Sequence, residues 1–474
     1  MATRPTNPTA ARPASRPAPP ATATPGRTPP TPRGGPILGS ALDLQRDFLG
    51  TFERAQREHG DVVRFLVGPP GVRHAVYAVF HPDGVRRVLA AEADAYRKDN
   101  VFYEEVRWAI GDGLLNSQDE RWLRQRRFIQ PLFTRKRIAG YADAMADEAQ
   151  RIVAAWRPAA ADAREIDAHA EMSRLTLRIV GQLLFGSDVE HAVPVIRRAF
   201  PVLGDHARTR AHSPVRVPHH WPTPANRRAM RARQALRGVC EDLIAQRRAA
   251  PGDGDDLLTL LVAARDGDER LDDAEIRDQI LVFLLAGHDT TAIALTFALF
   301  LLGRHPEVQR RLQDEVDAVL GDRTPGAADV DDLPYATMVL KEAMRLYPPA
   351  PALGRRTAGG DVVDGFALPP GADVVLSAWV THRHPAFWPE PERFDPERFS
   401  PEQEAGRHRH AWFPFGAGPR ACIGQYFSLL EATIALAMIV RAYEISSPDV
   451  RIPLTPRITL HPGAPVPCAL TPRR

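Results

Sequence analysis

Hydrophobic residues recur every three or four positions over most of this chain, which is the spacing of an amphipathic helix. The pattern predicts helices at 42–58 and 139–156. A longer apolar run at 280–302 carries the polar residues His288 and Asp289 at its centre. That run indicates a helix buried in a protein core, because a membrane span needs roughly 18 or more uncharged apolar residues. Most of the chain is therefore predicted to be helical.

Two short segments follow a strand pattern instead, with Pro and Gly turn residues inside each. They lie at 61–80 and 359–376 and predict two hairpins. The segment 205–228 lacks a clear period and predicts a long mobile loop. The expected fold class is mainly α with small β-sheets.

The first 36 residues differ in composition from the rest of the chain. They hold eleven of the 45 prolines and no acidic residue. Such a segment cannot bury an apolar face, so we expect a disordered tail over 1–36 and one domain over 37–474. The tail also lacks the apolar run of a secretory signal. A cytoplasmic protein without a membrane anchor is expected.

Charge and cysteine content exclude several function classes. The 61 Lys and Arg residues exceed the 58 Asp and Glu residues by three, too few to indicate nucleic acid as a partner. The three cysteines, Cys240, Cys422 and Cys468, are far apart in the sequence. They exclude a disulfide scaffold and a four-cysteine zinc site, and they indicate a reducing compartment.

Cys422 lies in the stretch FPFGAGPRACIG at 413–424, directly before a predicted helix. A helix N-terminus favours a thiolate. The glycines around Cys422 leave room for a flat, bulky group, and Arg420 can pair with an acidic group on such a ligand. The spacing fits neither a zinc site nor a c-type haem attachment. A catalytic cysteine with a distant histidine base remains open on these residues alone.

The stretch from Phe415 to Gly424 resembles the haem-binding loop F-x-x-G-x-R-x-C-x-G of the cytochrome P-450 superfamily at every fixed position. This resemblance implies haem b, with Cys422 as the metal ligand and Phe415, Gly416, Arg420 and Gly424 in the loop that binds the cofactor. It also implies the triangular fold of that superfamily, with the haem between a long central helix and the helix after Cys422.

The segment AGHDTT, at 286–291, resembles the family's A/G-G-x-D/E-T-T motif in that central helix. An Asp and two Thr in an apolar helix need polar partners or water. Gly287 and the threonine hydroxyls can open the helix locally. The resemblance implies that Asp289 and Thr290 are the catalytic acid and alcohol that carry protons to bound O2.

Two further motifs occur in the family's order. Glu342 and Arg345 lie three residues apart and resemble the E-x-x-R motif, and Arg398 lies in the matching P-E-R-F segment. The resemblance implies that these three residues form a buried structural network. An unpaired member of such a network would be expensive, roughly 3–5 kcal/mol.

The W-x-x-x-R pattern is represented by Trp122 and Arg126, one helical turn apart. The resemblance implies that both bind the haem propionates together with Arg356, with Arg355 as the alternative. The chain has His384 where the family often has Asp, and it lacks the hydrophobic N-terminal anchor of microsomal members. The second departure is typical of a soluble bacterial enzyme.

The resemblance implies a monooxygenase that inserts one atom of O2 into a lipophilic terpene, fatty acid or polyketide-like product of secondary metabolism, most simply by hydroxylation. Ala286, Leu353 and Ile458 are the expected substrate-pocket residues. The alternatives are a haem-thiolate peroxygenase or isomerase and a haem protein without catalysis. The intact Asp289 and Thr290 pair favours monooxygenation.

The chain has no flavin or iron-sulfur segment, so we expect that it receives electrons from a separate partner. We also expect the protein to be a monomer. A ferredoxin with its ferredoxin reductase is the first choice and a flavodoxin the second, with NAD(P)H as the ultimate source. A basic patch can steer an acidic partner. The candidate arginines are Arg121, Arg124, Arg127, Arg407 and Arg409.

Overall fold

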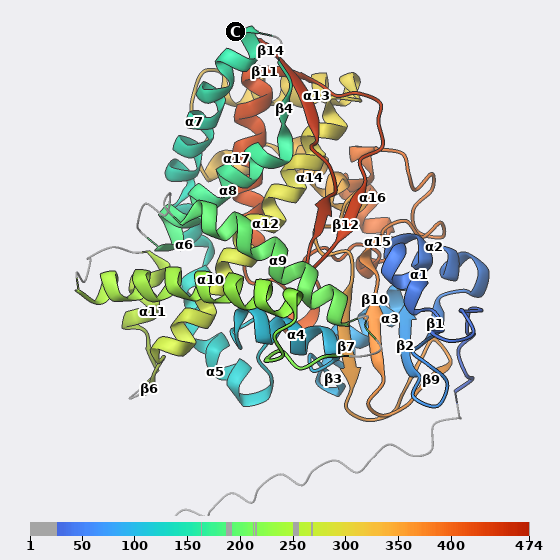
Figure 1. Cartoon of the computed structure of the whole chain (residues 1–474). Helices are drawn as coiled ribbons and strands as arrows, with labels where there is room; N and C mark the ends of the chain where they lie inside the picture. The colour runs from blue at the N-terminus through green and yellow to red at the C-terminus, as the bar shows by residue number, and fades with distance from the viewer. Residues whose placement is uncertain are drawn as a thin grey trace, which may run out of the picture.

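The protein is described by a computed structural model that covers residues 26–473, apart from 163, 186–191, 212, 214–215, 250–255 and 267–268. Helices make up most of it, and small sheets lie at its edges (Figure 1). The predicted class, mainly α with small β-sheets, is confirmed.

The long helix α12, Asp273–Leu302, forms the centre of the protein. Asp272 caps its first turn, and Glu275 returns the bond to the backbone of Asp272 in a capping box. The helix is apolar on nearly all sides, so it is stable only when neighbours cover it. α8 (Ala168–Phe185), α14 (Pro334–Leu346) and α17 (Gln425–Ala442) are among the helices that do so.

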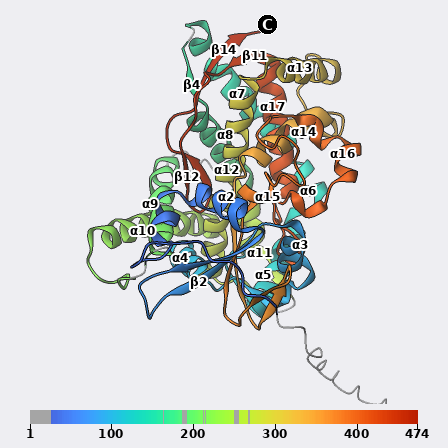
Figure 2. The ribbon, with the colours of Figure 1, turned by 90° about the vertical axis from the view of Figure 1, so that its right-hand side faces the viewer.

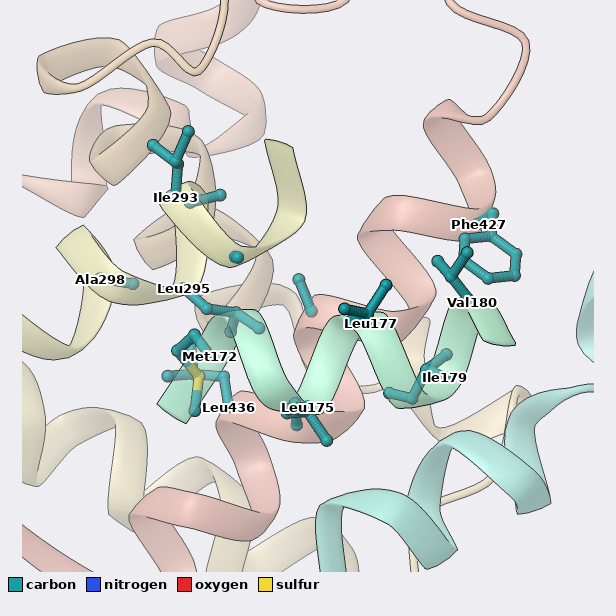
Figure 3. Close-up of a cluster of buried hydrophobic side chains, with 14 of the residues drawn as sticks. Met172, Leu175, Leu177, Ile179, Val180, Ile293, Leu295, Ala298, Phe427 and Leu436 are labelled. Atoms are coloured by element: carbon teal, nitrogen blue, oxygen red, sulfur yellow. The ribbon is translucent and has the colours of Figure 1, made fainter. Parts of the chain in front are cut away.

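Figure 3 shows part of this core, where side chains of α8, α12 and α17 meet. Met172 and Leu175 come from α8, Leu295 and Ala298 from α12, and Leu436 from α17. The three helices are thus held together mainly by apolar contact, and the Thr176 hydroxyl of α8 adds a hydrogen bond to the His288 carbonyl of α12 at 3.0 Å. α12 and α17 also pass the length and hydropathy test for a membrane span, but the apolar window of each is mostly buried inside the protein.

The largest sheet has the strand order β1-β2-β10-β7-β3. The hairpin predicted at 61–80 is confirmed, since β1 and β2 pair antiparallel. β10 runs parallel to β2 and antiparallel to β7. The bounds are β1 Val62–Val67, β2 His74–Val79, β3 Tyr96–Arg97, β7 Leu353–Thr357 and β10 Asp373–Leu376.

The second predicted hairpin, at 359–376, is shorter than expected. β8, Asp361–Val363, and β9, Phe366–Leu368, pair through a tight turn at Asp364 and Gly365. Both turn residues have positive φ, 50° and 80°, as a two-residue hairpin turn requires. β10 then leaves this hairpin and joins the large sheet.

The predicted helix at 42–58 is divided in two. α1 is Ala41–Arg46 and α2 is Phe48–His59. Asp47 lies between them in a non-helical conformation, and its carboxylate accepts a hydrogen bond from the Gly50 amide to cap α2. The helix predicted at 139–156 is α7, Ala142–Ala161.

Two predicted boundaries differ from the structure. Residues 26–36, assigned to the tail, lie against the sheets: Arg27 bridges to Phe366, and the Arg64 amide donates to the Pro30 carbonyl at 2.8 Å. Residues 1–25 lie outside the described residues. The loop predicted at 205–228 is also shorter, because α9, Val193–Ala211, extends into it and α10, Pro224–Ala249, begins inside it.

Ion pairs explain why α9 continues. Asp205 pairs with Arg457, and Arg210 pairs with Glu105 of α4 (Val101–Ile110). These partners stabilise the last turns of α9, whose own sequence is polar and does not predict a helix. The turned view in Figure 2 also places α9 and α10 near α4.

The remaining elements complete the bundle and its edges. The helices are α3 Pro82–Arg86, α5 Asp119–Ile129, α6 Arg135–Ala139, α11 Leu257–Ala263, α13 Pro306–Leu320, α15 Ala378–Thr381 and α16 Pro401–Gly406. The strands are β4 Ile166–Asp167, β5 Arg265–Asp266, β6 Glu269–Arg270, β11 Tyr443–Ser446, β12 Leu454–Pro456, β13 Leu460–Pro462 and β14 Pro467–Pro472.

Candidate active site

A cavity of about 270 Å³ lies between α12, the loop before α17, strand β7 and helix α5. Cys422 and residues from the middle of α12 both line it, and the α12 residues are largely apolar. The lining contains no histidine and no second cysteine. A zinc site or a Cys-His nucleophile, both considered from the sequence, therefore has no partner group in this cavity.

The loop around Cys422 presents the thiol to the cavity. The Cys422 amide donates to the Phe415 carbonyl at 2.9 Å, which folds the loop back on itself. Gly416 and Gly418 have φ of 68° and 66°, in the region that favours glycine. A Cβ at Gly418 would lie 2.0 Å from the Leu89 carbonyl oxygen. Phe415, Gly416 and Gly424 line the cavity as well.

Burial raises the pKa of the Cys422 thiol above its ordinary value. The Gly424 amide and the positive charges of Arg126 and Lys98 act in the opposite direction. A positively charged partner at the sulfur, such as a metal ion, would complete the stabilisation of the thiolate.

Ala286, Gly287 and Thr290 of α12 also line the cavity. The Thr290 hydroxyl donates to the Ala286 carbonyl at 2.8 Å. The helix is nevertheless continuous through this region, so the local opening expected from the sequence is not found.

Asp289, the neighbour of Thr290, does not line the cavity. Its carboxylate accepts a hydrogen bond from the Thr459 hydroxyl and lies 3.2 Å from Nε2 of His461. Burial would raise the pKa of Asp289, but the hydrogen bond and charge of His461, with His288 and Thr459, hold it below its ordinary value. The predicted acid and alcohol are adjacent in sequence, yet only the alcohol faces the cavity.

Four basic side chains line the cavity, Lys98, Arg126, Arg355 and Arg420, and we call them the cavity cations. None has a carboxylate partner among the described residues. Burial lowers the pKa of each, to about 10 for Arg420. Lys98 and Arg355 are almost fully buried. Buried cations without anions are unfavourable by themselves, so Lys98 and Arg355, with the half-buried Arg126 and Arg420 beside them, indicate an anionic ligand.

Trp122 of α5 lies beside the cavity cations. The Arg420 guanidinium is 4.4 Å from the centre of the Trp122 ring, and it donates to the Ser117 carbonyl at 2.6 Å. Trp122 and Arg126 both line the cavity. The spacing of W-x-x-x-R thus places both side chains on one helix face, as expected.

The structure corrects the assignment of Arg356 as a cavity residue. Arg356 donates to Asp373 at 2.7 Å and to the Asp99 carbonyl at 3.1 Å, and it does not line the cavity. Arg355, the alternative, does. Successive residues of a strand point to opposite faces, and Asp373 lies opposite Arg356 in the pairing of β10 with β7.

The substrate-pocket predictions have different outcomes. Ala286 and Leu353 line the cavity, whereas Ile458 packs against the core outside it. The sequence reasoning missed Lys98, which also lines the cavity. The one available signal was that Lys98 is one of only three lysines in a chain rich in arginine.

Glu342, Arg345 and Arg398 form a closed charged cluster, which we call the proximal network. Glu342 and Arg345 are fully buried, and two guanidinium nitrogens of Arg345 donate to the Glu342 carboxylate at 2.6 and 2.8 Å. Arg398 lies 3.5 Å from the same carboxylate. The remaining Arg345 donors bond to three backbone carbonyls.

The proximal network connects to the loop of Cys422 through His382. Arg345 donates to the His382 carbonyl at 3.0 Å, and the His382 ring accepts a hydrogen bond from the Phe413 amide at 2.9 Å. Phe413 begins the loop that ends at Gly424. The network therefore orients the cavity wall without reaching the cavity itself.

These residues fit the haem that the sequence resemblance implies. The cavity offers one thiol as a metal ligand, glycines that allow close approach, and four cations for which two propionate carboxylates are suitable partners. The unpaired buried cations carry this conclusion, because a neutral ligand would leave them without anions.

Comparisons with known proteins agree with this site. The profile of the family described as Cytochrome P450 matches residues 29–466. The chain is 38% identical over 437 residues to cyclooctatin synthase of Streptomyces melanosporofaciens, covering 91% of this chain and 93% of that protein. It is 34% identical over 438 residues to pentalenene oxygenase of Streptomyces avermitilis, covering 91% and 94%.

A third relative is cyclooctat-9-en-7-ol 5-monooxygenase of Streptomyces melanosporofaciens, 35% identical over 87% of this chain and 88% of that protein. The solved structure of the haem domain of cytochrome P450DA superposes with a TM-score of 0.84 at 28% identity, covering 95% of this chain and 99% of that one. With its family profile, its fold and its cysteine loop in agreement, the chain belongs to the cytochrome P450 family and is a cytochrome P450 monooxygenase.

Proposed function

We propose that this monooxygenase hydroxylates a terpene, using haem b held by Cys422 and O2 as cosubstrate. The apolar α12 side of the cavity carries the proposal: Val282, Phe283 and Ala286, with Leu353 across from them, offer no charged anchor. A hydrocarbon skeleton suits such a wall, because its binding needs only apolar burial. The names of two relatives, pentalenene oxygenase and cyclooctat-9-en-7-ol 5-monooxygenase, favour terpenes over fatty acids and polyketide-like products.

When bound, the haem supplies activation of dioxygen and transfer of one oxygen atom, with its thiolate ligand favouring cleavage of the O–O bond. The chain supplies the surroundings. The cavity cations bind the propionate carboxylates, and Trp122 supports Arg420 from its ring face. The proximal network holds the loop of Cys422 through His382.

Thr290 and Asp289 supply protons in this proposal. Thr290 and Thr291 of α12 both line the cavity, and the Thr290 hydroxyl is bonded to the Ala286 carbonyl. Asp289 is ionised and bonded to Thr459 and His461 on its other side. The His461 side chain is 14% exposed. The Asp289 carboxylate, which contacts this partly exposed imidazole, lies on the same helical turn as Thr290.

Electrons come, in this proposal, from a ferredoxin and its reductase, or from a flavodoxin, and ultimately from NAD(P)H. Arg124 is bound to two glutamates, and Arg407 is stacked on aromatic rings. The exposed members of the proposed docking patch are Arg121, Arg127 and Arg409, and Arg121 also lies 3.5 Å from Asp112. Reduction that slows as salt rises would support electrostatic docking, and insensitivity to salt would argue against it.

We also propose a cytoplasmic monomer. The three cysteines are free, which suits a reducing compartment. Size-exclusion chromatography with light scattering of the haem-loaded protein tests the monomer, and a stable dimer at micromolar concentration would contradict it.

The central test begins with the absorption spectrum of reduced, CO-bound protein. A red-shifted band supports the Cys422 thiolate, and its absence from folded, haem-loaded protein would overturn the cofactor assignment. A panel of cyclic terpenes, fatty acids and polyketides is then screened for spin-state change and for turnover with a surrogate ferredoxin system. Oxygenated terpenes as the main products are expected. Turnover with hydrogen peroxide alone, and none with O2 and electrons, would favour a peroxygenase.

Thr290→Ala tests proton delivery. Haem binding is expected to persist while most reducing equivalents are diverted to peroxide, because the cavity loses its hydroxyl beside Ala286. Thr296→Ala is the matched control, since the Thr296 hydroxyl makes the same bond to the carbonyl four residues earlier but lies in the core. Peroxide formed per NAD(P)H is measured, and equal coupling in both variants would contradict the role of Thr290.

A further inference from the structure

A cluster of potential metal ligands lies outside the cavity, where α4, α9 and the residues before α10 meet. Glu105 belongs to α4, His206 to α9, and His219 to the connection between α9 and α10. One ligand atom from each lies within 4.8 Å of the other two. We propose that Glu105, His206 and His219 form a binding site for a divalent transition metal ion such as zinc.

The ligand atoms lie close together, but His219 turns a different nitrogen toward each neighbour. Nδ1 of His219 lies 3.5 Å from Nε2 of His206, and Nε2 of His219 lies 3.0 Å from Oε2 of Glu105. Two nitrogen ligands of one zinc ion, each at about 2.0–2.1 Å, are separated by roughly 3.3 Å. One imidazole offers a single nitrogen to one ion, so the side chains must rotate before all three groups contact it, with a fourth position open to water.

The donor set suits a metal. Glu105 is 3% exposed and adds the negative charge, giving two imidazoles and one carboxylate, a donor set that zinc accepts.

The surroundings already hold these ligands in place. The His219 ring stacks on Trp108 of α4, with centroids 4.0 Å apart and planes at 6°. Arg210 donates to Oε2 of Glu105 at 2.8 Å and orients that carboxylate. Arg210 and Arg233, which lies over Trp108, also bring positive charge close to the site. We therefore expect micromolar rather than nanomolar affinity.

A bound ion would join three segments that are distant in sequence. α4 also carries Tyr103, which lines the cavity two residues before Glu105. Any ligand that binds only the folded state raises its stability. Zinc is thus expected to raise the melting temperature of the protein and to order the contact between α4 and α9.

The test uses the haem-loaded protein without a histidine tag, stripped with a chelator and titrated with zinc chloride by calorimetry. One site per chain is expected. His219→Phe preserves the ring that stacks on Trp108 but removes both nitrogens, and it should weaken binding at least tenfold. His220→Ala, at the exposed neighbour, is the matched control and should bind as the parent does. Unchanged haem spectra verify that each variant is folded.

Two results would overturn the proposal. One is zinc binding of equal affinity in the parent, His219→Phe and His206→Phe. The other is binding that is lost only in His408→Ala/His410→Ala, because those histidines lie in a separate cluster with Asp83. Glu105→Gln gives an independent check, since it retains the shape of the side chain and removes the charge that the ion needs. His219→Phe, His206→Phe and Glu105→Gln should each also abolish the zinc-dependent rise in melting temperature.

Discussion

The proximal network and the cavity cations are both clusters of buried charge, yet they are built in opposite ways. In the proximal network, Glu342 neutralises Arg345, and backbone carbonyls accept the remaining guanidinium donors. Among the cavity cations, Lys98 and Arg355 are also buried but have no carboxylate partner in the described part of the chain.

The difference separates structural charge from ligand-binding charge. A buried ion pair that is complete within the protein needs nothing else, and removing one partner leaves a costly isolated charge. A buried cation without a partner is unfavourable until an anion arrives. The proximal network should therefore matter equally with and without haem, whereas the cavity cations should oppose folding of the apoprotein and favour binding of the cofactor.

The largest expected effect comes from breaking the proximal network. Glu342→Ala leaves Arg345 buried and unpaired, so the free energy of unfolding should fall by about 3–5 kcal/mol in both apo and holo protein. Urea unfolding of both forms measures this loss, and a poor yield of folded protein would agree with it. A loss of stability confined to the holo form would show that the proximal network acts in haem binding, and would remove its difference from the cavity cations.

Removing a cavity cation should raise the stability of the apoprotein and weaken haem binding in the holo protein. Lys98→Met removes a buried charge, so the apoprotein should gain about 1 kcal/mol or more. The holo protein should bind haem about tenfold more weakly, equivalent to about 1.4 kcal/mol, because a propionate loses its partner. Urea unfolding of the apoprotein and haem transfer to an excess of apomyoglobin measure the two effects. Destabilisation of the apoprotein would show that Lys98 is structural.

Acid should weaken the proximal network through His382. Burial and the charges of Arg345 and Arg383 lower the pKa of His382 well below its ordinary value. Because the unfolded chain takes up this proton below about pH 6.5 and the folded one does not, stability is full above that pH and falls by about 1.4 kcal/mol per unit below it. Urea unfolding between pH 7.5 and 5.5 should show a shallower decline for His382→Gln than for the parent.

The cavity cations respond in a different pH window. The pKa of Lys98 is lowered by burial, then by Arg355 and Arg420. Stability of the apoprotein should therefore rise as the pH increases toward about 10.5, where the unfolded chain also loses its proton. Lys98→Met should remove that rise.

The smallest effect is expected for Arg356→Gln. Arg356 is 27% exposed, and its partner Asp373 also contacts His74. A loss of at most about 1 kcal/mol is expected in both forms, with haem transfer unchanged. The matched change Arg355→Leu should accelerate haem transfer. Equal rates of haem transfer in the two variants would show that Arg355 and Arg356 do not have different roles.

Those two arginines show where prediction from the sequence ended. The motif around Cys422, the E-x-x-R pair and the W-x-x-x-R pair are local patterns, and the structure brings their residues to the cavity or to the network beside it. Whether Arg355 or Arg356 faces the cavity depends on the register of β7 with β10. A shift of one residue in this register exchanges the two faces of the strand. Asp373, which pairs with Arg356, begins β10 and lies 17 residues further along the chain.

Asp289 is a second such case. Its position beside Thr290 is a fact of the sequence, but its direction depends on Thr459 and His461, which come from the far end of the chain. Lys98 is a third, since a lone lysine between short elements gave no sign of burial. In each case the deciding partner is distant in sequence, and no local period or spacing encodes it.

The sequence by itself determined the helical class, the central apolar helix and the cysteine loop, because helix period, glycine conformation and motif spacing are properties of short segments. Only the tertiary structure decided which charges are paired and which face the cavity. That decision rests on burial and on contacts between distant segments, and these set the electrostatic balance that distinguishes the cofactor site from its support.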